Sequence, residues 1–345
     1  MGVGETDRAV FFGELLMRLG TQHFERLVQS RELEIGFTGA EANAAVSLVN
    51  FGLRSSVVSV VPDNELGQAC LNYLQQFGVD VSHVLRFGPR LGTFYLETGV
   101  SQRPSKVIYD RAASSITQLA PGRIDWDKVL DSAKWFHFSG TAPALSESMA
   151  ATVAEACAAA KRMKLTVSCD LNYRRKLWSP EEAQTVMIPL MRNVDVLIGN
   201  EEDSMLVLGV VPKGVDVTSG RLDNESYRET TYRLHERFGF RYVATTLRES
   251  HSASENGWSG VLSDGKTFYQ SRKYDIRIVD RVGAGDAFSG GLIYSSLTGM
   301  DCQAMVEFAT AASCLKHSIH GDLNLVSLAE VSTLLRGHSS EHIQS

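Results

Sequence analysis

Short apolar runs rich in β-branched residues alternate with segments of helical periodicity along most of the chain. Residues 55–61 (SSVVSVV) precede an amphipathic stretch that stops at Gly78, and residues 134–140 (KWFHFSG) precede the alanine-rich stretch 148–163. Residues 241–246 (RYVATT) form a further run of the same kind. Apolar runs separated by helices of about 10–15 residues predict βαβ units and a mainly parallel sheet that helices cover on both faces.

Two regions, residues 8–38 and 88–112, break this alternation and have the pattern of consecutive strands with little helix. We expect a small second sheet, built from about 13–38 and 88–112, that projects from the main body as a lid over a cleft. The exposed edges of such a sheet also allow two copies of the chain to pair through it. Residues 1–345 then form one α/β domain.

Polar residues gather where the predicted strands end. Asp170 closes one apolar run, Asn200 closes the next, Thr245 and Thr246 close a third, and a glycine-rich loop follows the strand-like residues 275–280. Ligands of an open parallel sheet bind beyond the carboxyl ends of its strands. The sequence therefore predicts a cleft at this edge of the sheet.

Composition narrows the range of partners. The chain has 345 residues, of which 43% are hydrophobic and 21% charged, and its net charge is −6. This charge disfavours nucleic acid or an anionic membrane as the main partner. The start lacks the pattern of a signal peptide, and no run of ~18 apolar residues occurs. The five cysteines are odd in number and never in C-x-x-C spacing, so we interpret them as reduced thiols of a cytoplasmic protein.

The loop DRVGAGDAFS, residues 280–289, places two glycines and a carboxylate at the start of a predicted helix. It is neither a Walker A loop nor a G-x-G-x-x-G motif, which makes a nucleotide-dependent oxidoreductase a weak alternative. Two interpretations remain. In one, Asp286 simply caps the helix. In the other, the amides of Gly283, Ala284 and Gly285 form an anion hole and Asp286 is a general base.

The same loop resembles the C-terminal signature D-T-x-G-A-G-D-x-F of the ribokinase-like (PfkB) carbohydrate kinases. Residues 38–52 (TGAEANAAVSLVNFG) resemble the sugar-binding stretch of that family, and VPDNELG at 61–67 resembles the stretch that follows it. The resemblance extends from about residue 9 to about 335. It implies a ribokinase-like three-layer αβα sandwich with a mainly parallel central sheet and a small β-sheet lid.

Within that family the chain is similar to the 2-keto-3-deoxygluconate kinases. The segments that carry this likeness are GAEAN (39–43), FYLE (94–97), RPSKVIYDRA (103–112), DLNYRRKLW (170–178), DRVGAGD (280–286) and KHSIHGDLN (316–324). The likeness implies ATP-dependent phosphorylation of 2-keto-3-deoxy-D-gluconate at its primary hydroxyl, which gives 2-keto-3-deoxy-6-phosphogluconate. The sequence does not choose between this acid and its C4 epimer.

The implied sugar site draws residues from both halves of the chain. Its members would be Gly39, Ala40, Glu41, Ala42, Asn43, Tyr95, Tyr109, Arg111, Arg174, Asp286 and Asp322. Independently of the resemblance, the planar guanidinium of arginine suits a carboxylate, which a neutral sugar lacks. Each of these residues also has an interpretation without a role in sugar binding. The two arginines could form surface ion pairs, and the tyrosines could pack in the core. Glu41 could be a charge in the first turn of a helix, and for this residue we favour that interpretation.

ATP and Mg²⁺ are the implied cofactors. The residues implied for the nucleotide are Asn172, Arg174, Asn200, Thr246, Arg248, Ser252, Gly283 and Gly285. The N-x-x-E motif of the family is NEED here, so Asn200 and Asp203 would hold the metal through water. Asn200 followed by acids is equally typical of a capped helix start.

Asp286 would take the proton of the attacking hydroxyl, and we expect it to do so at the ordinary pKa of a carboxylate. A kinase of a neutral ketose such as fructose is the nearest rival. A non-catalytic sugar-acid sensor on the same scaffold is a more distant one, which the intact glycine loop disfavours.

Overall fold

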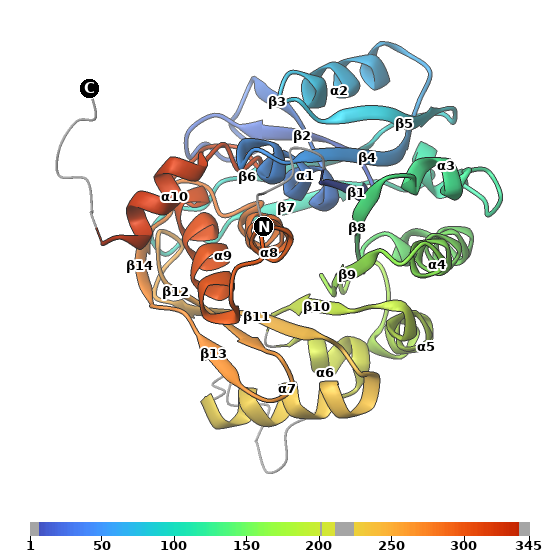
Figure 1. Ribbon diagram of the computed structural model, residues 1–345. Helices are drawn as coiled ribbons and strands as arrows, with labels where there is room; N and C mark the ends of the chain where they lie inside the picture. The colour runs from blue at the N-terminus through green and yellow to red at the C-terminus, as the bar shows by residue number, and fades with distance from the viewer. Residues whose placement is uncertain (1–6, 201, 211–223, 338–345) are drawn as a thin grey trace.

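The computed structural model describes residues 7–200, 202–210 and 224–337. Within these residues the main sheet has ten strands in the order β13-β12-β11-β10-β9-β8-β1-β4-β5, with β14 paired to β12 (Figure 1). Its strands are β1 (Arg8–Phe12), β4 (Arg54–Val61), β5 (Asp80–Arg86), β8 (Ala133–Ser139), β9 (Thr166–Asp170), β10 (Val196–Gly199), β11 (Tyr242–Ser250), β12 (Glu255–Ser263), β13 (Phe268–Gln270) and β14 (Tyr274–Arg277).

The seven neighbouring strands from β11 to β5 pair in parallel, whereas β12, β13 and β14 add an antiparallel edge. The parallel strands are buried along most of their length, as expected for a sheet that is covered on both faces. The expectation of a mainly parallel sheet is confirmed.

Helices form the two outer layers. Helices α1, α2, α8, α9 and α10 share one hydrophobic core, and α3 to α7 share the core on the other face (Figure 1). Their bounds are α1 (Ala40–Asn50), α2 (Glu65–Gln75), α3 (Trp126–Leu130), α4 (Glu147–Arg162), α5 (Pro180–Leu190), α6 (Asp203–Leu208), α7 (Asn224–Phe238), α8 (Ala284–Leu297), α9 (Cys302–Lys316) and α10 (Leu328–Leu335). The three-layer αβα sandwich is thereby confirmed.

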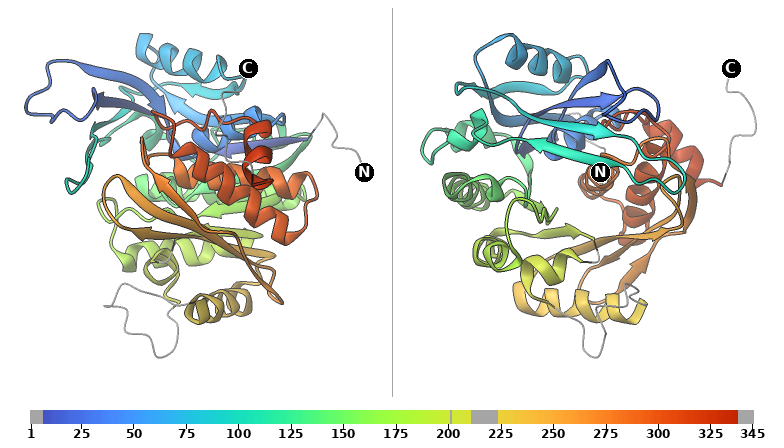
Figure 2. Two further views of the ribbon diagram at one scale, coloured as in Figure 1. Left: turned by 90° about the vertical axis from the view of Figure 1, so that its left-hand side faces the viewer. Right: turned by 180° about the vertical axis from the view of Figure 1, so that it is seen from behind.

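Four strands form the smaller sheet, in the order β3-β2-β6-β7, and they extend beyond the main body (Figure 2). They are β2 (Leu16–Thr21), β3 (Leu33–Thr38), β6 (Gly92–Glu97) and β7 (Lys106–Asp110). All four lie within 13–38 and 88–112. The run that begins at Arg8 is divided, because β1 belongs to the main sheet and the chain crosses to the smaller sheet at Gly13–Leu15.

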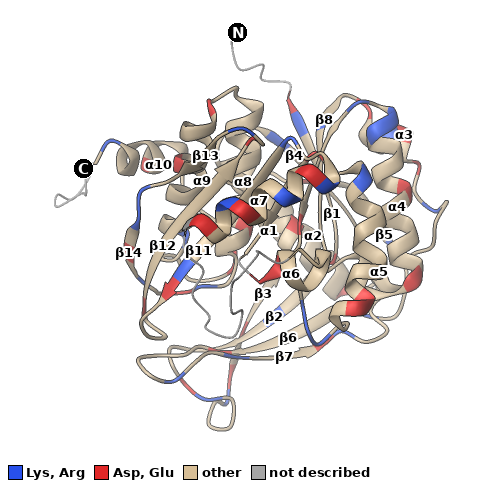
Figure 3. Ribbon diagram, turned by 90° about the horizontal axis from the view of Figure 1, so that it is seen from below, with Lys and Arg blue, Asp and Glu red and all other residues tan. Residues whose placement is uncertain are grey.

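The surface carries both signs of charge. Helix α7, for example, has both blue and red segments in Figure 3. No helix among the described residues is both long and apolar enough to cross a bilayer. All five cysteines are free, and four of them lie in helices. The free cysteines agree with the reduced thiols expected from the sequence.

Candidate active site

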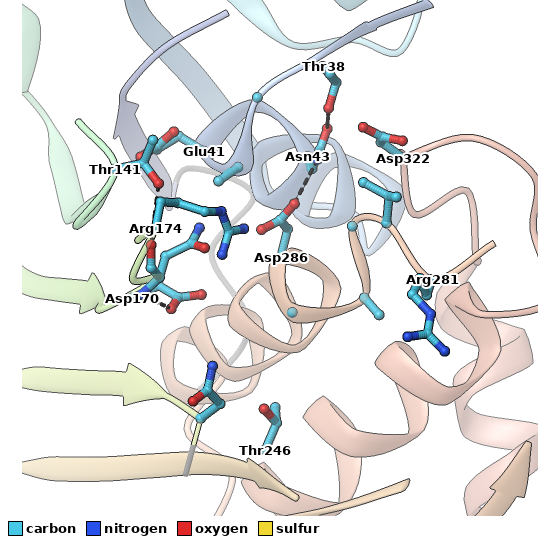
Figure 4. Close-up of a pocket in the computed structure, with 18 of the residues that line it drawn as sticks. Thr38, Glu41, Asn43, Thr141, Asp170, Arg174, Thr246, Arg281, Asp286 and Asp322 are labelled. Carbon is cyan, nitrogen blue, oxygen red and sulfur yellow. Dashed lines mark hydrogen bonds between the residues drawn. The ribbon is translucent and has the colours of Figure 1, made fainter. Parts of the chain in front are cut away.

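A cleft of about 500 Å³ lies beyond the carboxyl ends of β9, β10 and β11, between the smaller sheet and the start of α8 (Figure 4). Asp170 and Asn200 line it from the ends of β9 and β10, and Thr246 lines it from β11, just beyond the point where the pairing with β10 stops. Their convergence follows from the parallel pairing of those strands, which brings equivalent ends to one edge of the sheet.

Asp286 lies in the first turn of α8 and is half-buried in the cleft. It does not cap the helix, because Gly283 occupies the N-cap position and no side chain among the described residues caps that end. Instead, the Asn43 side-chain amide donates a hydrogen bond of 2.7 Å to Oδ2 of Asp286, and the Thr38 hydroxyl donates one of 3.0 Å to Oδ1 of Asn43 (Figure 4). Asp286 is therefore oriented by a two-step chain that leaves its other oxygen open to the cleft.

Burial raises the pKa of Asp286 to about 8. The nearby carboxylates of Asp170 and Glu41 raise it further, while the Asn43 hydrogen bond and the charge of Arg174 lower it. The ordinary pKa that we expected from the sequence is therefore wrong, because the sequence does not show how far the fold buries the Asp286 carboxyl.

The glycine loop is folded tightly ahead of α8. Gly283 has φ +84°, and a Cβ atom there would lie 1.9 Å from the backbone oxygen of Asp322, so only glycine fits. The amide of Ala284 makes a long bond of 3.3 Å to the Arg281 carbonyl. The amide of Gly285 has no acceptor among the described residues, and open space lies beside its Cα.

Arg111 lies under the smaller sheet with only 10% of its side chain exposed. Its guanidinium is 4.2 Å from the centre of the Tyr109 ring, and one terminal nitrogen is 3.3 Å from a carboxylate oxygen of Glu14. Two of its buried nitrogens have no hydrogen-bond partner in the described part of the chain. The burial of Glu14 raises its pKa to about 7, although Arg111 and the Ser114 hydroxyl oppose this rise.

Arg174 points into the cleft toward Asp286 from the loop after β9 (Figure 4). Beneath it lie Asp170 and Asp203, whose pKa values burial raises to about 7 and about 6. The charge of Asp203 adds to the rise at Asp170, and Arg174 opposes both shifts. The Asn200 side-chain oxygen accepts bonds from the amides of Glu202 and Asp203, as the capped-helix interpretation predicts, yet the residue still lines the cleft.

Glu41 occupies the first turn of α1, but it is more than a first-turn charge. Its side chain is buried, accepts a 2.8 Å bond from the Ser139 amide and lines the cleft. Burial raises its pKa.

The structure brings together most of the residues singled out from the sequence. Those that line the cleft are Gly39, Ala40, Glu41, Asn43, Tyr109, Arg111, Asn172, Arg174, Asn200, Asp203, Thr246, Arg248, Gly283, Ala284, Gly285, Asp286 and Asp322.

Ala42, Tyr95 and Ser252 do not line the cleft. Ala42 is buried in the core under α1. Tyr95 pairs with Ile108 on the face of the smaller sheet opposite to Phe94 and Tyr109, because side chains alternate along a strand. The Ser252 hydroxyl accepts a bond from the Ser254 amide within its own loop.

Several lining residues were missed. Glu14 and Thr141 follow the ends of β1 and β8, so the rule that found Asp170 could have found them. Asn256 and Trp258 lie on the antiparallel strand β12, where no sequence signal marks them, and each has a buried polar atom without a partner among the described residues.

The comparisons with known proteins agree with one another. The model of the pfkB family carbohydrate kinases matches residues 6–327. A 2-dehydro-3-deoxygalactonokinase of Haloferax volcanii is 34% identical over 332 residues, which cover 96% of this chain and 98% of that protein. A 2-dehydro-3-deoxygluconokinase of Thermoproteus tenax is 29% identical over 318 residues, covering 91% and 89%. The crystal structure of a 2-dehydro-3-deoxygluconokinase of Thermotoga maritima matches with a TM-score of 0.92 at 45% identity, covering 96% of this chain and all of that one.

Proposed function

This chain belongs to the pfkB family of carbohydrate kinases, and we propose that it transfers the γ-phosphoryl group of ATP to the primary hydroxyl of 2-keto-3-deoxy-D-gluconate. The relatives just described carry the names of kinases for this acid or for its galacto epimer. Both acids have the carboxylate and the primary hydroxyl that the proposed site requires.

The observation that carries the substrate class is the guanidinium of Arg111. Of its two nitrogens without a hydrogen bond, the terminal one lies 3.3 Å from Glu14 and Nε has no partner among the described residues, so the buried cation is only partly compensated. Glu14 neutralises only part of the charge of Arg111, because its raised pKa favours a carboxyl that is partly protonated near neutral pH. A substrate carboxylate would supply the missing charge and both acceptors.

Arg174 lines the same cleft and points toward Asp286 (Figure 4). A six-carbon acid held at its carboxyl end by Arg111 would extend its primary hydroxyl toward Asp286. Asn43, Tyr109 and Asp322 also line the cleft and would offer partners for the remaining oxygens. Arg174 would then neutralise charge on the transferred phosphoryl group or on the sugar acid.

In the proposed step, Asp286 removes the proton from the primary hydroxyl as that oxygen bonds to the γ-phosphorus. The bond from phosphorus to the bridging oxygen breaks, and its electron pair leaves with ADP. The hydrogen bond from Asn43 keeps one carboxylate oxygen occupied, so the other faces the hydroxyl. Such transfers depend on positioning and charge neutralisation rather than on covalent catalysis.

The start of α8 would hold the transferred phosphoryl group. Its unpaired amide at Gly285 and the positive end of the helix dipole favour an anion in the open space beside the loop. Gly283 and Ala284 would complete this anion hole, as the sequence predicted.

Mg²⁺ fits the acids below Arg174. Burial raises the pKa of both carboxyls of Asp170 and Asp203, and the charge of Asp203 adds to the rise at Asp170, so a cation beside them would be favourable. Among the described residues, no group of three or more His, Cys, Asp or Glu side chains is arranged to bind a metal directly. We propose that Asn200 and Asp203 hold the ion through water, where it would neutralise phosphate charge.

The nucleotide would lie along the carboxyl end of β11. Thr246 and Arg248 line the cleft there, and the Arg248 side chain is exposed. Asn172 lines the same cleft from the loop after β9, and Ser252 lies in the loop after β11.

The test is ADP release by purified protein with ATP and Mg²⁺. 2-Keto-3-deoxygluconate and its galacto epimer are compared with fructose, ribose and gluconate. We expect turnover on the keto-deoxy acids that falls at least ~100-fold in Asp286→Asn while sugar-acid binding, measured by calorimetry, is retained. Turnover on a neutral sugar alone would overturn the substrate class, and turnover on none would favour a sensor.

A further inference from the structure

Four ionisable side chains are buried together beside the glycine loop. Arg18, Asp280, Lys316 and Asp322 are each at most 6% exposed. They come from strand β2 of the smaller sheet, from the loop ahead of α8 and from the end of α9 with the segment after it. Two cations and two anions make the cluster neutral, which is the condition under which buried charges are tolerated.

Arg18 is the centre of the cluster. One terminal nitrogen lies 2.7 Å from Oδ2 of Asp280, and the other donates to Oδ1 of Asp322. Lys316 is the fourth member of the cluster. Its ammonium group donates to the backbone oxygens of Asp280 at 3.2 Å and of Ile319 at 3.3 Å.

Asp280 bonds the glycine loop, and the backbone of Asp322 packs directly against it. The other carboxylate oxygen of Asp280 accepts a 3.0 Å bond from the Val282 amide, which immediately precedes Gly283. The backbone oxygen of Asp322 is the atom that a Cβ at Gly283 would meet. The guanidinium of Arg18 therefore joins both segments to strand β2, in addition to the apolar packing of Val282 against Leu16 on the same strand.

Arg18 itself does not line the cleft, although Leu16 on the same strand does. We propose that Arg18 is a positioning residue for phosphoryl transfer, one that keeps the glycine loop in register with the smaller sheet so that the anion site and the sugar site form together. This inference rests on the proposed kinase reaction, but not on the identity of the sugar.

The test compares Arg18→Gln with Arg103→Gln. Arg103 is a matched control, because it pairs at 2.8 Å with the buried carboxylate of Glu97 in the same small sheet, lines no part of the cleft and donates no side-chain bond to the glycine loop. We expect Arg18→Gln to lower kcat at least about tenfold with KM for the sugar within about threefold, since small misplacements of reacting groups lower the rate steeply. Arg103→Gln should keep the wild-type kcat.

A second readout needs no substrate. Hydrogen exchange of peptides that cover residues 279–286 should be at least about tenfold faster in Arg18→Gln and unchanged in Arg103→Gln. If the glutamine variant does not fold, Arg18→Lys takes its place, because a lysine keeps the charge but cannot pair with two carboxylates through a rigid fork. Both changes are required: a kcat within about twofold of wild type, or unchanged exchange at 279–286, would overturn the proposal.

Failure of the proposed substrate can be told apart from failure of this inference. If the wild type phosphorylates a different sugar, the same comparison is made with that sugar. If it phosphorylates none, the exchange measurement alone decides whether Arg18 positions the loop.

Discussion

At the scale of single residues, the cleft contains side chains that are held in place without being fully satisfied. Arg111 stacks on Tyr109 and touches Glu14, yet neither Nε nor the terminal nitrogen beside Glu14 makes a hydrogen bond to the described residues. Asp286 has one oxygen bound by Asn43 and the other open. Pre-oriented groups of this kind bind a ligand at a lower entropic cost than mobile ones.

Arg111→Gln should lower kcat/KM for the keto-deoxy acid by about 10- to 100-fold, mostly through KM, because a charge-assisted pair with the substrate is lost. The matched control is Arg90→Gln, whose partner Asp110 is exposed and whose ion pair contributes little. Steady-state kinetics of the two variants decide the matter. Equal KM values in both would show that Arg111 does not bind the acid.

The pKa of Asp286 predicts a pH-rate profile. A general base acts only when it has lost its proton, so kcat/KM for the sugar should rise with pH and level off as pH passes about 8. The ordinary pKa that the sequence suggested would instead give a profile that is flat above pH 6. Initial rates at low sugar and saturating ATP between pH 6 and 9 distinguish the two, and a flat profile would contradict the assignment.

At the scale of elements, the glycine loop requires glycine at position 283 for two reasons, its positive φ and the lack of space for a Cβ atom. Gly283→Ala puts a Cβ into the left-handed region and against the Asp322 backbone, so it should lower the melting temperature by several degrees. Gly285→Ala has open space and should melt like wild type, but its methyl group would occupy the proposed anion site and lower turnover.

Calorimetry and ADP release on both variants check this pair. A normal melting temperature for Gly283→Ala would contradict the fit argument. A fully active Gly285→Ala would contradict the position of the anion site.

The sequence predicted elements better than it predicted which way their side chains face. Periodicity located the parallel strands and the helices between them, because buried strands and amphipathic helices have distinct apolar spacings. It did not separate β1 from β2, since a chain crossing between two sheets keeps its apolar character. Tyr95 was expected at the sugar, but the alternation of β6 turns Phe94 to the cleft instead.

The same limit explains why Arg18 and Asn256 were not found. Each is a single polar residue within a strand, and only its partners in distant segments give it a site. Strand ends, in contrast, converge on one edge by topology alone, so Asp170, Asn200 and Thr246 could be grouped from the sequence.

At the scale of the whole molecule, acids are concentrated in the cleft of a protein with net charge −6. Glu14 and Asp170 have pKa values near 7 and Asp286 near 8, against about 4 for a carboxyl in the unfolded chain. The folded state therefore keeps protons that the unfolded state has lost. Stability from these groups is complete below about pH 4 and is lost as pH rises through 7 to 8.

Buried histidines act in the opposite direction but at lower pH. Burial lowers the pKa of His137 to about 3 and of His317 to about 4, whereas an unfolded histidine titrates near 6.5. Their contribution grows with pH and is nearly complete by pH 7. The interval from pH 7 to 8.5 therefore isolates the carboxyl groups.

We expect the melting temperature of the protein without ligands to fall by about 2–5 °C over that interval. Asp286→Asn should reduce the fall, because it removes the group that titrates highest among these acids. Asp127→Asn, on the exposed surface of α3 beside Arg162, is the matched control and should leave the slope unchanged. If scanning calorimetry gave both variants the wild-type slope, the proton bound by the folded state would not reside on Asp286, and the pH-rate profile expected from it would lose its physical basis.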